Sequence, residues 1–176
     1  MPLDRTELEN ALRRVLTARG PDAPSYAVVA PVIWSEAGAS LLLEVRAAGI
    51  PQAGDPCFPG GRIEPGETPA QAASRELEEE LGIRVRPERF LGQLPTVHTI
   101  LGRRTDVFVC TVSDEEAAHP RRNPAEVSEV LRVPMSFFLS SPDADSYPAE
   151  GHIVWGMTAG AIRHLCAAWQ RAGLPC

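Results

Sequence analysis

The sequence predicts a mixed α/β fold built as one domain. Helical spacing of apolar residues near both ends and in the middle of the chain is interrupted by runs typical of strands. The chain has 176 residues, 44% of them hydrophobic, and it contains no repeat or low-complexity tract. A chain of this length can bury a sizeable core in a single domain. We therefore expect residues 1–176 to form one domain.

The first elements are a helix and two strands. Residues 4–19 alternate charged and apolar residues at helical spacing, which predicts an amphipathic helix. Apolar and β-branched runs then predict strands near Tyr26–Trp34 and Ser40–Arg46. The segment Ala47–Pro59 is longer than most connections, so we expect it to be a functional loop.

The central helix has clear signals at both ends. Thr68 is a capping residue, Pro69 suits the first helical position, and Gln71 stands where the reciprocal partner of a capping box belongs. Gly82 supplies the left-handed residue that commonly closes a helix. The sequence therefore predicts a helix over Pro69–Leu81.

Acidic residues crowd the end of this predicted helix. Glu76, Glu79 and Glu80 stand at i, i+3 and i+4, so their side chains share one face. Each like-charge pair costs a few tenths of a kcal/mol, and acids in the last turn oppose the helix dipole by roughly 0.3–1 kcal/mol each. A bound divalent cation would reverse these terms, because Mg²⁺ and Mn²⁺ prefer clustered oxygen ligands. The competing interpretation is a solvated acidic face, and we expect that of Glu78, which points about 100° away.

The second half of the chain continues the mixed pattern. Strands are predicted near Phe90–Val97, Asp106–Val112 and Val127–Val133. Helical spacing returns over residues 158–172, which predicts a terminal helix.

Composition excludes several classes of function. The net charge of −6 lacks the basic footprint of nucleic-acid binding, so we expect no nucleic-acid partner. No segment approaches the length of a membrane span and no apolar leader opens the chain, so we expect a soluble cytoplasmic protein without a membrane partner. The cysteines and histidines are scattered without ligand spacing, which favours free thiols, solvated or satisfied imidazoles, and no zinc site. They are Cys57, Cys110, Cys166, Cys176, His98, His119, His152 and His164.

Residues 61–83 resemble the signature of the Nudix hydrolase family. That signature is a Gly, five residues, a Glu, seven residues, and then Arg-Glu-apolar-any-Glu-Glu-any-Gly-apolar. Every specified position is filled here, by Gly61, Glu67, Arg75, Glu76, Leu77, Glu79, Glu80, Gly82 and Ile83. The resemblance implies an α/β/α sandwich with a central mixed β-sheet, and hydrolysis of a substrate that contains a diphosphate.

The resemblance also implies roles for single residues. Glu76, Glu79 and Glu80 correspond to carboxylates that bind Mg²⁺ or Mn²⁺, and the carbonyl of Gly60 corresponds to a backbone metal ligand. Glu67 and Arg75 correspond to a pair that orients the helix.

A general base must stand within reach of the attacking water. In the Nudix family this base is a glutamate of the signature or a carboxylate from a distant loop. Glu126 and Glu129 are the candidates for the distant one, although for either residue taken alone the sequence favours an ordinary position in a surface loop.

The flanking segments resemble coenzyme A pyrophosphatases. The upstream motif matches at Leu42, Leu43, Arg46, Ala47, Gly54, Phe58, Pro59, Gly60 and Gly61. The loop is one residue shorter than the motif, and Ile50 or Pro51 stands where a second arginine is expected. The segments VPMSFFL and HIVWGMTAGAIRHL are similar to the carboxyl-terminal part of that subfamily.

This resemblance implies cleavage of coenzyme A or an acyl-CoA to 3′,5′-ADP and 4′-phosphopantetheine. Arg46, or less readily Arg103 or Arg104, would meet the extra phosphate. ADP-ribose, another nucleoside diphosphate derivative or a nucleoside triphosphate is the alternative substrate. A non-catalytic nucleotide-sensing domain is a more remote alternative, since such domains usually lose acids of the signature. The sequence leaves open whether the molecule forms a homodimer.

Overall fold

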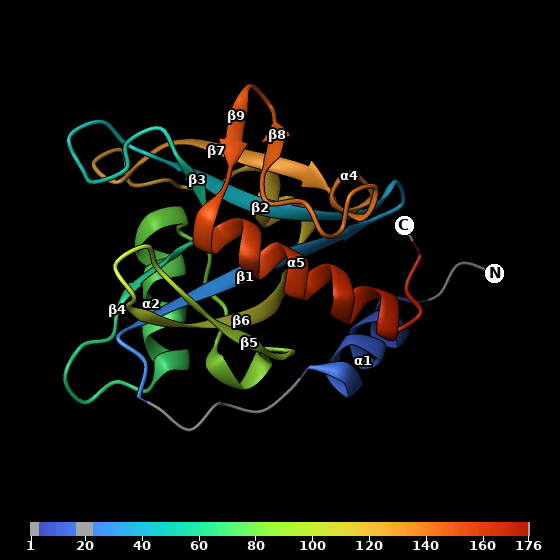
Figure 1. Ribbon diagram of the computed structural model, residues 1–176. Coiled ribbons are helices and arrows are strands. Elements are labelled where there is room, and N and C mark those ends of the chain that lie inside the picture. The colour runs from blue at the N-terminus through green and yellow to red at the C-terminus, as the bar shows by residue number, and fades with distance from the viewer. Residues whose placement is uncertain (1–3, 17–22, 176) are drawn as a thin grey trace.

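The fold is a mixed β-sheet held between helices (Figure 1). A computed structural model describes residues 4–16 and 23–175. The sheet has the order β3-β2-β1-β6-β5, β4 also pairs with β1, and β7 with β2. The β1–β6 pair is parallel and the other pairs are antiparallel, which confirms the predicted fold class. The strands are β1 (Tyr26–Ser35), β2 (Gly38–Arg46), β3 (Pro56–Cys57), β4 (Gly60–Arg62), β5 (Gly92–His98), β6 (Arg104–Val112) and β7 (Val127–Pro134).

Five α-helices and a 3₁₀ turn are found among the described residues. They are α1 (Arg5–Val15), α2 (Pro69–Leu81), η1 (Pro87–Arg89), α3 (Asp114–Ala118), α4 (Met135–Leu139) and α5 (Gly156–Arg171). In the described part of the chain no helix is both long and apolar enough to cross a membrane.

The first helix is shorter than the predicted 4–19. Its backbone leaves the helix at Leu16, which is extended with ψ 131°, and Leu16 packs closely on Gly92 of β5. Residues 17–19 lie outside the described part of the chain. At the other end, α5 begins at Gly156, two residues before the predicted start.

The sheet buries both of its faces. Along β1, Val28, Ala30 and Val32 belong to one apolar cluster and the alternate residues Ala27, Val29 and Ile33 to another. The first cluster contains the apolar side chains of α1 and α5, and the second contains those of α2. Helices α2 and α5 therefore cover opposite faces, as alternation of side chains along a strand requires.

Helix α2 starts and ends where the sequence predicted. The Thr68 hydroxyl accepts a hydrogen bond from the Gln71 N–H at 3.2 Å, and the Gln71 side chain accepts one from the Thr68 N–H at 2.8 Å. Gly82 closes the helix in the left-handed conformation, with φ 68°. These caps fix the rotation of the helix and hence the direction of its glutamates.

The predicted loop Ala47–Pro59 is partly ordered as strand. Its end forms β3, which pairs with β2 through Glu44 and Cys57. A hairpin of β8 (Tyr147–Ala149) and β9 (His152–Val154), which the sequence did not predict, rises beside this segment (Figure 1). The His152 Nδ1 lies 3.3 Å from the Gly54 carbonyl oxygen, so the hairpin contacts the loop.

Strand β4 lies against β1 without room for a side chain at Gly60. A Cβ at this position would lie 2.4 Å from the Ala27 carbonyl oxygen and 2.5 Å from the Val28 Cα. Because both of these atoms belong to the backbone, neither can move aside as a side chain could. Gly60 is therefore required for the approach of β4, which carries the chain from β3 to α2.

We expect Gly60→Ala to lower the free energy of unfolding by about 1–3 kcal/mol or more, since overpacking usually costs this much. Gly160→Ala is the matched control, because a Cβ there meets nothing nearer than 3.7 Å and the residue lies within α5. The control should be neutral or stabilise by about 0.5–1 kcal/mol. Urea denaturation of both variants measures the difference, and equal stabilities would contradict the tight packing of β4.

Candidate metal centre

Three carboxylates from distant parts of the sequence converge beside α2. Glu76 and Glu80 of α2 and Glu126 of the loop before β7 each offer an oxygen, and these oxygens lie within 4.8 Å of one another. The Glu126 loop is held at the end of α2, because the Asn123 N–H donates to the Glu80 carbonyl at 2.8 Å. We call Glu76, Glu80 and Glu126 the carboxylate triad. Of the two distant candidates, the structure brings Glu126 to the signature.

Glu80 is the most buried member of the triad, with 4% of its surface exposed. Burial, followed by the negative charge of Glu44, raises the pKa of Glu80 to about 9. The Gly60 N–H donates to the Glu80 Oε2 at 2.9 Å and partly offsets this effect. Gly60, whose carbonyl is the predicted backbone ligand, therefore stands directly beside the triad.

Glu76 is half-buried, and burial is the main cause of its raised pKa. Gly61 makes room for this side chain, since a Cβ on Gly61 would lie 2.3 Å from the Glu76 Oε1. The two adjacent glycines thus have separate uses: Gly60 brings β4 against β1, and Gly61 admits a carboxylate.

Arg75 binds the glutamates around it. Its Nε and Nη2 donate to the two oxygens of Glu67 at 2.8 and 3.1 Å, and its Nη1 donates to Glu76 at 2.8 Å and Glu79 at 3.0 Å. Nη2 also donates to the Arg62 carbonyl of β4 at 3.2 Å. Arg75 and Glu67 therefore tie α2 to the preceding segment, the geometry that a supporting pair requires.

Glu79 does not belong to the triad in this structure. It is paired with Arg75, and 54% of its side chain is exposed. It remains on the same helical face as Glu76 and Glu80, one turn or less away.

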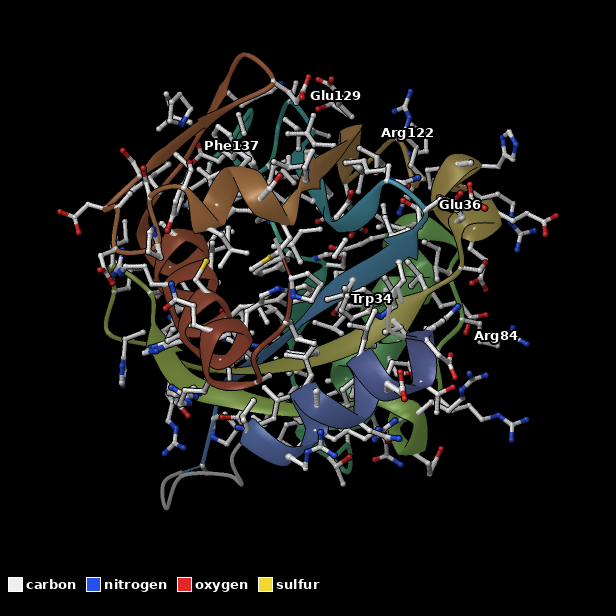
Figure 2. All side chains as sticks on the ribbon, turned by 90° about the vertical axis from the view of Figure 1, so that its right-hand side faces the viewer. Trp34, Glu36, Arg84, Arg122, Glu129 and Phe137 are labelled. Atoms are coloured by element: carbon white, nitrogen blue, oxygen red, sulfur yellow. The ribbon has the colours of Figure 1, made fainter. Side chains whose placement is uncertain are left out.

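Glu129 is engaged elsewhere. Its Oε2 lies 3.1 Å from the Nε2 of His152, and Figure 2 shows Glu129 at the outer edge of the molecule. Since the other ring nitrogen of His152 faces the Gly54 carbonyl, this imidazole has partners on both sides.

The three candidate substrate-binding arginines lie in different surroundings. The Nε of Arg46 donates to the Pro51 carbonyl at 2.7 Å. Burial raises the pKa of Glu44, and the charge of Arg46 offsets part of that rise. Arg103 stacks on Tyr26, with its guanidinium carbon 5.6 Å from the ring centre. The Nη2 of Arg104 lies 3.9 Å from the Oδ1 of the buried Asp106. Of the three arginines, Arg46 is the one beside the acidic site.

Sequence reasoning missed Glu44. This residue of β2 is 1% exposed, and its burial raises its pKa to about 7. The Cys57 thiol donates to the Glu44 Oε1 at 3.6 Å. A signal was present, because a carboxylate interrupts the apolar run of a strand in which the consecutive residues Leu42 and Leu43, on opposite faces, are both fully buried.

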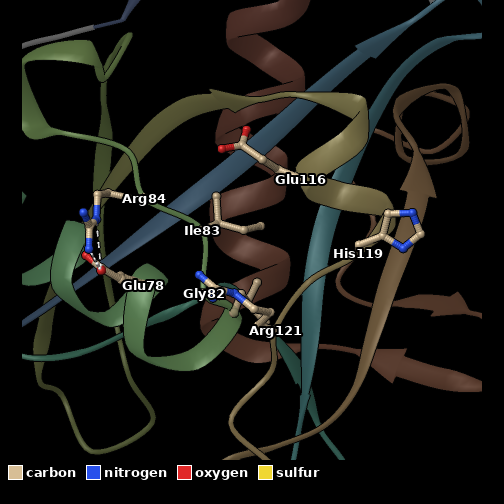
Figure 3. Close-up of a pocket in the computed structure, with 8 residues that line it drawn as sticks. Glu78, Gly82, Ile83, Arg84, Glu116, His119 and Arg121 are labelled. Atoms are coloured by element: carbon tan, nitrogen blue, oxygen red, sulfur yellow. Dashed lines mark hydrogen bonds and ion pairs between the residues drawn. The ribbon is translucent and has the colours of Figure 1, made fainter.

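A pocket lies beyond the end of α2, and no residue of the carboxylate triad lines it. This cavity of about 450 Å³ is shown in Figure 3. Its lining residues are Glu78, Leu81, Gly82, Ile83, Arg84, Glu116, His119 and Arg121. Glu78 forms an ion pair with Arg84 there, so the prediction that Glu78 is only solvated was wrong. The charges of Glu78 and Glu116 oppose those of the two arginines, and this mixed lining does not resemble a metal site.

The triad suits a divalent cation. Carboxylate oxygens are the hard ligands that Mg²⁺ and Mn²⁺ prefer, and their spacing here allows one ion to contact several of them. Burial is the main cause of the raised pKa values of Glu76 and Glu80, and the charges of neighbouring carboxylates add to it.

Comparison with known proteins agrees with this geometry. The profile of the NUDIX domain family matches residues 24–150. A protein of Schizosaccharomyces pombe named a probable nudix hydrolase is 30% identical in an alignment of length 147, which covers 75% of this chain but 51% of that protein. The Nudix hydrolase NudL of Photorhabdus laumondii is 30% identical in an alignment of length 159, which covers 82% of this chain and 84% of that protein.

The same fold is found among solved structures. The NUDIX domain of NrtR from Shewanella oneidensis, solved in complex with ADP ribose, superposes with a TM-score of 0.56 at 20% identity. The match covers 88% of each chain. Because the profile spans most of the sequence and a relative of similar length shares 30% of its residues, this chain belongs to the Nudix family of pyrophosphohydrolases.

Proposed function

We propose that this protein is a Mg²⁺- or Mn²⁺-dependent enzyme that hydrolyses coenzyme A or an acyl-CoA. Water would cleave the P–O–P bridge and release 3′,5′-ADP and 4′-phosphopantetheine or its acyl derivative. The observation that carries the chemistry is the convergence of Glu76, Glu80 and Glu126 beside a signature that is complete. Every acidic residue of the signature is present, which argues against a non-catalytic sensor domain, since such domains usually lose some of these residues.

Each acidic residue has a part in this proposal. Glu76 and Glu80 would hold the cation with the Gly60 carbonyl, and Glu79 would join them by leaving Arg75. A bound cation neutralises phosphate charge and lowers the pKa of a coordinated water. Glu126 would accept the proton of the attacking water, since it lies in the triad whereas Glu129 is paired with His152. Arg75 and Glu67 would keep α2 oriented.

The substrate assignment rests on the segment before the signature. Arg46 belongs to the motif shared with coenzyme A pyrophosphatases and lies beside Glu44 and the loop that ends in β3. A guanidinium there is well suited to a phosphate group. The absence of the motif's second arginine keeps ADP-ribose as the second candidate, and the ADP ribose complex of the NrtR domain favours it. A nucleoside triphosphate is the third.

Removing a signature carboxylate should abolish turnover and leave the fold intact. We expect Glu79→Gln and Glu80→Gln each to lower kcat/KM by more than the roughly 10–100-fold that loss of an outer partner of a metal ligand costs. Glu78→Gln removes the same charge from the same helix on the face that carries the Arg84 pair, and should retain activity. Steady-state kinetics measures the activity of each variant, and circular dichroism shows whether its fold is intact. Unchanged activity in Glu80→Gln would reject the site.

The substrate can be identified with a panel of metabolites. Coenzyme A, acetyl-CoA, ADP-ribose and nucleoside triphosphates are incubated separately with enzyme and Mg²⁺, and the products are resolved by mass spectrometry. We expect 3′,5′-ADP and 4′-phosphopantetheine from coenzyme A at the highest kcat/KM. Turnover of ADP-ribose without turnover of coenzyme A would replace the first substrate by the second and leave the reaction class unchanged.

Metal affinity and the stability of the metal-free protein should depend on pH in opposite directions. The pKa of Glu80 is about 9 in the fold against 4.5 as its ordinary value, so the folded state holds a proton that the unfolded state lacks between these pH values. Stability in EDTA should therefore fall as the pH rises from about 5 to about 9, while Mn²⁺ binds more tightly because fewer protons compete. Thermal melts and calorimetry in buffers of different ionisation enthalpy test both trends. In Glu80→Gln both slopes should be smaller, and slopes equal to those of the wild type would contradict the assignment.

A further inference from the structure

Glu44 is a carboxylate in the interior of the sheet without a cationic hydrogen-bond partner. It is 1% exposed, its Oε1 accepts from the Cys57 thiol at 3.6 Å, and its Oε2 is buried with no hydrogen-bond partner among residues 4–16 and 23–175. The nearby Arg46 directs its Nε to the Pro51 carbonyl. A buried carboxylate is costly, and an apolar side chain would fill the same space without that cost. Packing alone therefore does not explain this residue.

The position of Glu44 connects it to the metal centre. Its charge is the main cause, after burial, of the raised pKa of Glu80. Its strand partner Cys57 lies three residues before Gly60, whose N–H binds the Glu80 carboxylate. Glu44 thus approaches the most buried triad member from the sheet, whereas Glu76 and Glu126 are both partly exposed.

We propose that Glu44 is a positioning residue of the metal site, which places a fourth negative charge behind Glu80 and so tightens the binding of the divalent cation. The inference rests on the proposed function, since it requires that the triad binds a metal. Without a cation, Glu80 keeps its proton, because a second negative charge beside Glu44 is unfavourable in surroundings of low polarity. With a cation in the triad, the same charge at Glu44 attracts it. Glu44 therefore destabilises the metal-free protein and stabilises the protein with bound metal.

The substitution Glu44→Gln tests this role, because it keeps the shape of the side chain and an oxygen for the Cys57 thiol. We expect the Mn²⁺ dissociation constant, measured by electron paramagnetic resonance without substrate, to rise by about 10–100-fold, as for loss of other outer partners of metal ligands. The melting temperature in EDTA should stay equal or rise. A purely structural role would give the reverse, with a lower melting temperature in EDTA and an unchanged Mn²⁺ dissociation constant.

Two control variants separate charge from packing. Cys57→Ser keeps the Glu44 charge and a donor to it, so Mn²⁺ affinity should stay within about threefold of the wild type, a difference of well under 1 kcal/mol. Glu78→Gln removes a glutamate of α2 that is paired with Arg84, and should likewise bind Mn²⁺ as the wild type does.

The outcomes distinguish this inference from the proposed function. If the wild type binds Mn²⁺ and hydrolyses its substrate while Glu44→Gln binds Mn²⁺ equally well, the role of Glu44 is refuted and the proposed function stands. If the wild type itself binds no Mn²⁺, even with a diphosphate substrate present, both are refuted.

Discussion

The repulsion between carboxylates at the end of α2 is the constraint on which the site depends. Glu76 and Glu80 share a helical face, and Glu126 is brought to them by a loop held at the Glu80 carbonyl. Arg75 compensates Glu76 from one side, and the Gly60 N–H compensates Glu80 from the other. These contacts leave an excess of negative charge, which protons or a divalent cation must neutralise. In the proposed function, a bound divalent cation would supply the positive charge that the protein alone lacks there.

Close approach of the backbone makes this concentration of charge feasible. Gly60 has no room for a side chain against Ala27 and Val28, so β4 lies directly on β1 and its N–H reaches the Glu80 carboxylate. Helix α2 buries its apolar face on the same strand, which fixes the glutamates from the other direction. The triad is thus supported by a rigid strand and a capped helix, and only Glu126 depends on a loop.

The sequence predicted local features well and long-range contacts poorly. Both ends of α2 were predicted because Thr68, Gln71 and Gly82 act within a few residues. The short strands β3, β4, β8 and β9 were missed, since two or three residues carry no measurable alternation and form strands only through their partners. Choosing between Glu126 and Glu129 required knowing that His152, far along the chain, pairs with Glu129. Glu44 was missed because the significance of its charge comes from Glu80, on another element.

The division between rigid and looped parts also explains why the signature predicts a reaction and not a substrate. In the proposed function the triad acts on a diphosphate, which all candidate substrates share, and Glu76 and Glu80 are held in place by α2 and β4. What differs between coenzyme A, ADP-ribose and a nucleoside triphosphate lies beyond the diphosphate, and the proposed contacts to that part are made by Arg46 and the segment before β3. His152 of the β8–β9 hairpin contacts Gly54 of that segment and Glu129 of β7. Selectivity is therefore expected to depend on contacts among three distant segments, and these can change without disturbing the carboxylates.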